Sequence, residues 1–100
     1  MKKMIAMALL MASFGLMAED IGKLKVINIK SNDTLSMRSA ASHKSKLVTR
    51  LPYNARGLTM PVENCRYNKD APSSPHTWCE VHYKKYTGWV NTYYIDYDMD

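Results

Sequence analysis

The sequence predicts an all-β protein: a small, partly open barrel of five to six short strands, preceded by a signal peptide. Three observations carry this prediction. Short runs rich in β-branched and aromatic residues alternate with turn residues across 24–95. These runs lie too close together for helices to connect them. The segment 78–94, WCEVHYKKYTGWVNTYY, contains both tryptophans and one of the two cysteines, and a small domain depends on burying such a segment.

Residues 1–18 have the composition of a secretory signal peptide. Lysines occupy positions 2 and 3, an almost uninterrupted apolar run covers 5–16, and Ala18 precedes two acidic residues. We expect cleavage near Ala18, export to the periplasm or beyond, and a polar leader at 19–23. The alternative is an uncleaved membrane anchor, but an apolar run of about a dozen residues is shorter than the roughly 20 that span a bilayer.

The charge of the chain favours an anionic partner only mildly. The net charge is +5, and removal of residues 1–18, which contain two lysines and no acidic residue, would leave +3 over 82 residues. Such a balance favours surfaces like the cell wall or lipid head groups. Basic residues do not alternate with aromatic ones as in a nucleic-acid groove, so we expect no nucleic-acid partner.

The first half of the domain contains three expected strands. Residues 24–30 are rich in Val and Ile and predict the first strand, which a turn at 31–33 ends. Residues 35–38 alternate apolar and polar side chains and predict the second. A serine-rich surface loop at 39–46 precedes the third strand at 47–51, which Pro52 stops, and a turn follows at 53–57.

The middle of the chain predicts a strand, a disulfide and a long loop. Leu58, Met60 and Val62 alternate with polar residues or proline, so we expect all three on the buried side. In an exported chain, Cys65 and Cys79 are expected to form a disulfide. The bond would close 13 intervening residues, which is worth about 3 kcal/mol in the chain-entropy model. Residues 66–77 are expected to be a loop, most mobile at 72–75.

The C-terminal part predicts a β-hairpin. Cys79, Val81 and Tyr83 fall on one face of its first strand, a turn is expected at 84–86, and the second strand ends near Asn91. Gly88 is expected at a bulge or at a close approach of another backbone. Residues 91–95 should form a short or 3₁₀ turn that packs Tyr94 or Ile95 against the barrel, and 96–100 a solvated acidic tail.

Several of these residues resemble the pattern of the bacterial Src-homology-3 (SH3-like) domains of the cell envelope. The matching segments are L-S-M-R-S at 35–39, L-P at 51–52 before Gly57, W-C-E-V at 78–81, T-G-W-V at 87–90 and Y-I at 94–95. Ser36 stands where that family usually has Asn, and Ala40-Ala41 where it has Gly-Pro, so the turn after Arg38 is expected to differ. The resemblance implies an SH3-like barrel over 24–95, with the 39–46 loop beside a ligand groove.

Reactive groups are poorly placed for catalysis. Cys79 and His82 would point to opposite faces of one strand, and a disulfide would remove the thiol. The spacing of the histidines and cysteines resembles no common zinc pattern, and the acidic residues of 96–100 have nothing to hold them at a fixed separation. We therefore expect no enzyme activity, no catalytic residue, no bound metal and no cofactor.

Aromatic side chains are the better candidates for function. Val81, Tyr83 and either Trp89 or Val90 are expected in the core. The candidate binding groove is formed by half-exposed rings at turns and strand ends, namely Tyr53, Tyr67, Trp78 and Tyr93. The alternative is that these rings only cover the ends of the barrel.

The sequence therefore predicts a non-catalytic binding module. The resemblance implies attachment to peptidoglycan or to a wall-associated partner protein. A second hypothesis is a structural or regulatory subunit that docks on a single envelope protein without binding the wall polymer.

Overall fold

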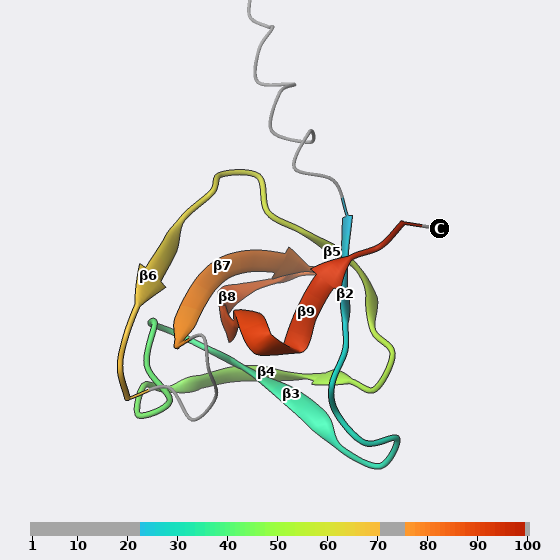
Figure 1. Ribbon diagram of the computed structural model, residues 1–100, viewed down its shortest axis with the longest axis horizontal. Helices are drawn as coiled ribbons and strands as arrows, with labels where there is room; N and C mark the ends of the chain where they lie inside the picture. The colour runs from blue at the N-terminus through green and yellow to red at the C-terminus, as the bar shows by residue number, and fades with distance from the viewer. Residues whose placement is uncertain (1–22, 71–75, 100) are drawn as a thin grey trace, which may run out of the picture.

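Eight β-strands and one 3₁₀ helix make up the regular structure of residues 23–70 and 76–99, which the computed structural model describes (Figure 1). These residues contain no α-helix and no helix long and apolar enough to cross a membrane. The elements are β2 (Lys23–Val26), β3 (Thr34–Arg38), β4 (Leu47–Pro52), β5 (Arg56–Thr59), β6 (Cys65–Tyr67), β7 (Thr77–Tyr83), β8 (Tyr86–Asn91), η3 (Thr92–Tyr94) and β9 (Ile95–Tyr97).

The strands form one antiparallel sheet in the order β4-β3-β8-β7-β5-β2-β9, with β6 attached to β7. Because β4 and β9 end this order, the sheet is not closed. Figure 1 shows the sheet curled so that β3 and β4 lie across from β5 and β2. The predicted all-β class and the small, partly open SH3-like architecture are confirmed, with more strands than expected.

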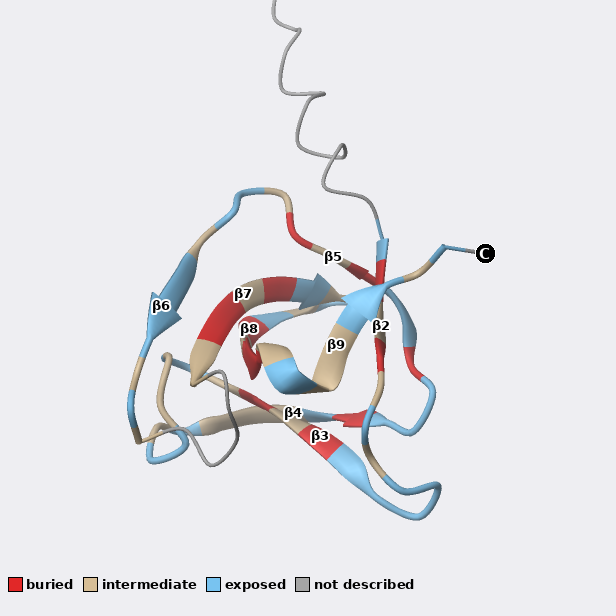
Figure 2. Cartoon of the chain, in the orientation of Figure 1, coloured by how far each residue is buried: buried red, intermediate tan, exposed pale blue. Residues whose placement is uncertain are grey.

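The interior is filled by residues that alternate along the strands. Leu35 and Met37 on β3, and Val81 and Val90 on the hairpin, are all at most 5% exposed. Figure 2 shows these buried positions on the strands that surround the interior. Other buried members of the cluster are Leu24, Val26, Leu51, Ala55, Leu58, Met60 and Cys79, and Tyr83, Tyr94 and Ile95 pack against it.

The first strand is shorter than the predicted 24–30. It ends at Val26 because Asn28 adopts a left-handed backbone conformation with φ of 64°. The side chain of Asn28 donates to the carbonyl of Tyr93 at 2.8 Å, which holds this bend against η3. The chain leaves the sheet here, so 27–33 become available to line a cavity.

Val62 does not lie on the buried side as predicted, because a bulge interrupts the strand. β5 and β6 both pair with the same side of β7, through Thr59 opposite His82 and Cys65 opposite Cys79. Between these two pairs the β5–β6 segment advances six residues and β7 only three. The three extra residues form a bulge. Val62 lies within it and is 70% exposed.

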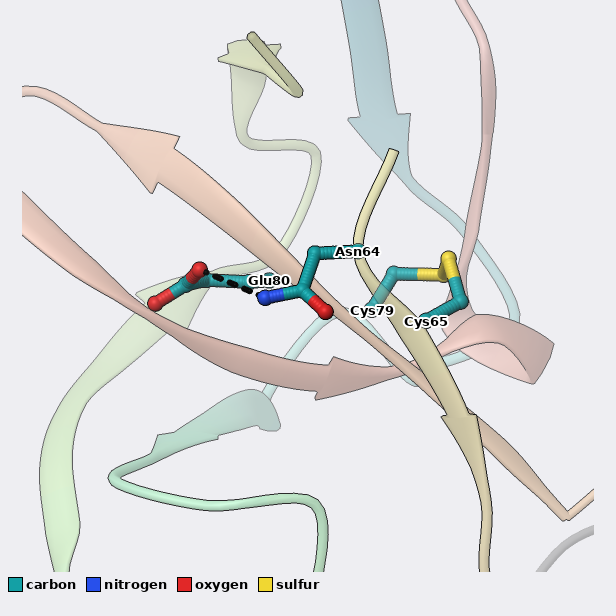
Figure 3. The surroundings of a disulfide bond; sticks show 4 residues. All are labelled: Asn64, Cys65, Cys79 and Glu80. Carbon is teal, nitrogen blue, oxygen red and sulfur yellow. Dashed lines mark hydrogen bonds between the residues drawn. A yellow bond between two sulfur atoms is a disulfide. The ribbon is translucent and has the colours of Figure 1, made fainter. Parts of the chain in front are cut away.

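The predicted disulfide between Cys65 and Cys79 is present (Figure 3). It joins directly opposite residues of β6 and β7, whose Cα atoms are 4.1 Å apart. Beside it, the amide of Glu80 donates to the carbonyl of Asn64 at 3.0 Å, and the Asn64 side chain donates to the Glu80 carboxylate at 3.1 Å. The bond therefore fixes the register just beyond the bulge.

The loop predicted at 66–77 is shorter than expected. β6 continues to Tyr67, which lies opposite Thr77, and the Asn68 amide donates to the His76 carbonyl at 2.8 Å. The expected mobile tip at 72–75 lies outside the described residues, as do the predicted signal peptide at 1–18 and most of the 19–23 leader.

The hairpin of β7 and β8 forms as predicted, with Lys84 and Lys85 at its turn. Lys84 has a φ of 54°, which suits a tight two-residue connection. Between Trp89 and Val90, it is Val90 that is fully buried. The predicted close approach at Gly88 is confirmed, since a Cβ there would lie 2.8 Å from the Arg38 carbonyl oxygen.

Part of the acidic tail predicted at 96–100 belongs to the sheet: Asp96 and Tyr97 are exposed as expected but lie on β9, and residue 100 is outside the described residues. After η3, whose Tyr94 packs on the core as expected, β9 pairs with β2. Asp98 then accepts two hydrogen bonds from the Arg56 guanidinium, one from Nε at 2.8 Å, and its side chain is only 12% exposed. On the outer edge of β9, the Tyr97 amide donates to Asp96 Oδ1 and the Ile95 amide to the Thr92 carbonyl.

Replacing both cysteines, as C65A/C79A, should lower the free energy of unfolding by about 3 kcal/mol, because the unfolded chain regains the entropy of a 13-residue loop. Urea denaturation of the oxidised protein and the variant measures the difference. A loss below about 1 kcal/mol would contradict the role of the bond in a domain of this size.

Gly88→Ala should destabilise the fold by about 1–3 kcal/mol, because the added methyl group would overlap Met37 and the Arg38 backbone. Thr87→Ser, at the exposed neighbouring position, is the matched control and should stay within about 0.5 kcal/mol of wild type. Equal thermal midpoints for G88A and wild type would show that β8 and β3 can separate at no cost.

Candidate functional site

A cavity with a volume of about 420 Å³ lies beside β3. The bend after β2 and the start of β3 form one wall, and the 39–46 loop contributes to another. The ends of β7 and β8 and helix η3 complete the lining. The lining residues are Asn28, Ile29, Lys30, Asp33, Thr34, Leu35, Ser36, Arg38, His43, Trp78, Asn91 and Tyr94.

The inner part of the cavity is formed by Trp78 and Asn91, which lie directly opposite each other on β7 and β8. Trp78 is 3% exposed and Asn91 2%. Because side chains alternate along a strand, Trp78 points away from the core that Cys79 and Val81 fill, and it lies outside the core cluster. Asn91 Oδ1 caps η3 by accepting from the Tyr93 amide at 2.9 Å.

The indole Nε1 of Trp78 is a buried donor that makes no hydrogen bond to any described residue. Leaving such a donor unpaired costs about 1–3 kcal/mol. Its neighbours in the cavity include the apolar side chains of Leu35 and Tyr94. Because this atom is itself buried, it is enclosed behind the cavity wall, and the surface that a ligand would meet here is mainly apolar.

Basic side chains outnumber acidic ones around the cavity. Lys30 and Arg38 line it, together with His43, against a single acidic residue, Asp33. Asp33 Oδ1 is already engaged by the Thr34 amide at 2.7 Å, and Arg38 Nη1 donates to the Ser45 carbonyl at 3.0 Å. An anionic group such as a carboxylate would find complementary charge here.

The 39–46 loop owes its shape to its serines. Ser45 Oγ can donate its one proton to the Ser42 carbonyl at 2.7 Å or to the Ala40 carbonyl at 3.1 Å, while the Ser39 amide closes the base by donating to the Lys46 carbonyl at 2.8 Å. These bonds shape the turn at Ala40-Ala41. They give His43 a fixed place on the cavity wall.

The four predicted groove residues differ in their relation to this cavity. Only Trp78 lines the cavity, and it is buried rather than half exposed, because β7 begins one residue before it and places it inside the sheet. Tyr53 follows β4 and is 46% exposed, Tyr67 lies on β6 at 71%, and Tyr93 lies on η3 at 44%.

Tyr67 packs edge-on against His76, and Tyr93 edge-on against Tyr94. Both rings therefore have described neighbours at the surface of the fold. A role of these tyrosines in ligand binding stays a prediction.

The prediction missed most of the cavity residues. Lys30 and Asn28 belong to a segment that was assigned to a strand, and His43 was treated as an ordinary solvated histidine. Asn91 was detectable, since Asn before a short helical turn is a typical N-cap. Arg38 was within the recognised L-S-M-R-S segment, but its role at the cavity depends on the loop that follows.

Another, smaller hollow of about 240 Å³ is lined by both cysteines of the disulfide and by Thr92 of η3. Leu24, Met60, Ile95 and Tyr97 give it apolar walls. The described residues contain no cluster of three or more side chains that could hold a metal ion.

Comparison with known protein families gives one result. The family model of the bacterial SH3 domain matches residues 33–96, which covers most of the domain, including β3, the hairpin and η3. Among curated proteins and among solved structures, none matches the chain significantly.

Trp78→Ala should lower the free energy of unfolding by about 3–5 kcal/mol, because it removes a large ring that is only 3% exposed. Tyr67→Ala is the control, since its ring is 71% exposed, and should change stability by less than about 0.5 kcal/mol. Urea titrations followed by circular dichroism measure both. If W78A is as stable as wild type, the indole does not support the cavity.

Proposed function

Because the chain belongs to the bacterial SH3 domain family, we propose that it is an exported, non-catalytic binding module of the cell envelope that binds peptidoglycan through the cavity beside β3. The observation that carries the proposal is the combination, in one cavity, of apolar walls and a cationic rim.

Export is supported by two independent features. Residues 1–18 have the pattern of a signal peptide. Cys65 and Cys79 form a disulfide, and such bonds persist mainly in oxidising compartments outside the cytosol. Together they favour the periplasm or the cell exterior, where peptidoglycan is accessible.

The size and chemistry of the cavity support a ligand of this kind. A volume of about 420 Å³ is within the range of roughly 300–1,000 Å³ typical of small-ligand sites, and it suits a short peptide segment. Peptidoglycan carries short peptides with aliphatic side chains and free carboxylates. The aliphatic groups would contact Leu35 and Trp78, and a carboxylate would lie near Lys30 and Arg38.

A binding role without catalysis agrees with the oxidation of both cysteines to a disulfide. Both cysteines of the chain are held in the disulfide, so neither provides a thiolate nucleophile in the oxidised protein. The reactive pair considered from the sequence, Cys79 and His82, is separated by the sheet: Cys79 is buried and His82 is exposed.

Sedimentation of the mature protein with purified peptidoglycan tests the proposal. Wild type should co-sediment at low salt, and Lys30→Glu should bind about fivefold less tightly, because one favourable charge contact is replaced by a repulsive one. The matched control is Lys85→Glu, which makes the same change of net charge at the hairpin turn, away from the cavity.

Equal losses for K30E and K85E would show that only the overall charge matters and would remove the cavity from the proposal. A wild-type protein that stays in the supernatant would end the peptidoglycan proposal. If that protein instead co-purifies with one envelope protein at a fixed ratio, the second hypothesis, a subunit docked on that protein, replaces it.

A further inference from the structure

The 39–46 loop contributes His43 to the cavity wall. It is hydrogen-bonded to residues 68–70, which follow β6 and do not line the cavity. Asn68 Nδ2 donates to the Ala41 carbonyl at 2.8 Å, and Ser42 Oγ donates to Asp70 Oδ2 at 3.2 Å. These contacts join residues 27 and 28 positions apart in the sequence. One wall of the cavity therefore depends on contacts made outside it.

Residues 68–70 are themselves anchored to the disulfide hairpin. The Asp70 amide donates to Asn68 Oδ1 at 3.0 Å, and the Asn68 amide donates to the His76 carbonyl at 2.8 Å. The adjacent pair, Tyr67 opposite Thr77, lies two positions along β6 and β7 from the disulfide-linked pair. Asp70 thus has a fixed position from which to hold the loop.

The carboxylate of Asp70 is only half satisfied by hydrogen bonds. Oδ2 accepts from Ser42, but Oδ1 is buried and accepts no hydrogen bond from a described residue. Beside this oxygen lies the ring of His43, whose Nδ1 is 3.7 Å from Oδ1. A protonated imidazole would give this oxygen a charge-assisted partner, and a neutral one would not.

We propose that Asp70 is a positioning residue that, with Ser42 and His43, forms a pH-dependent latch holding the 39–46 loop in place as a wall of the cavity. The inference rests on the proposed function for its ligand, and it names the regulation of that same site. Protonation of His43 tightens the latch, and it also adds positive charge to the cavity wall.

The other charged groups around His43 set the direction of the effect. Lys30, Arg38 and Asp33 line the same cavity, Lys44 and Lys46 lie on the loop, and Lys69 adjoins Asp70. Among these groups histidine is the side chain whose charge ordinarily changes between about pH 5 and 8. Binding of a carboxylate-bearing ligand therefore strengthens as the pH falls through this range and weakens as it rises.

The latch is measured first without ligand, by hydrogen exchange of the 39–46 amides in the mature, oxidised protein at pH 6 and pH 8. Protection factors, corrected for intrinsic exchange, should be about two- to fivefold higher at pH 6 in wild type, as expected for a partly exposed ion pair. Asp70→Asn and His43→Gln should abolish this difference. His82→Gln, at an exposed histidine on β7, should retain it.

The ligand experiment repeats the peptidoglycan sedimentation at the same two pH values. Wild type and H82Q should bind about two- to fivefold more tightly at pH 6, and H43Q should bind equally at both. D70N should show a smaller pH dependence than wild type, because His43 can still add charge to the cavity wall but no longer has its carboxylate partner. If H43Q or D70N keeps the wild-type pH dependence of loop protection, the latch is refuted. If loop protection responds as expected but no protein sediments, the latch stands and the proposed ligand fails.

Discussion

Strand β7 is the constraint on which the rest of the structure depends, because it is paired along both edges and its two faces serve different purposes. One face contributes Cys79 and Val81 to the core, and the other contributes Trp78 to the cavity. The disulfide fixes the register of β6 on this strand immediately after a bulge, where strand pairing by itself would be weakest. A shift of one residue would exchange the two faces, and both core and cavity would be lost.

Much of the fold could be predicted because local pattern and tertiary packing agree. The alternation of Leu35 and Met37, the hairpin around Lys84 and the pairing of the cysteines are all visible in the sequence and confirmed by the structure. Val62 was misplaced because alternation cannot reveal a bulge until the partner strand is known. The first strand is short because Asn28 adopts a left-handed backbone conformation. Asn tolerates this conformation better than most residues, but its presence in the sequence does not show that it adopts it.

The cavity was harder to predict than the fold, because its members come from segments that acquire their positions from other segments. Exposure of Trp78 was inferred from its place near a loop, yet the extension of β7 to Thr77 encloses the ring. His43 reaches the cavity wall only through the loop that Ser45 shapes and Asp70 holds. Such dependence on long-range contacts is the physical reason that residue type and spacing identified a binding module but not its site.

The outer edge of β9 has a further consequence. The bonds from Ile27 to Tyr94 and from Asp98 to Lys23 show that alternate residues of this strand face β2, which turns the amides of Ile95 and Tyr97 outward. Both amides are already engaged, by the Thr92 carbonyl and the Asp96 carboxylate. A foreign strand approaching this border finds no donor to pair with and meets a negative charge. This border of the open sheet is thus protected against extension by other chains into aggregates.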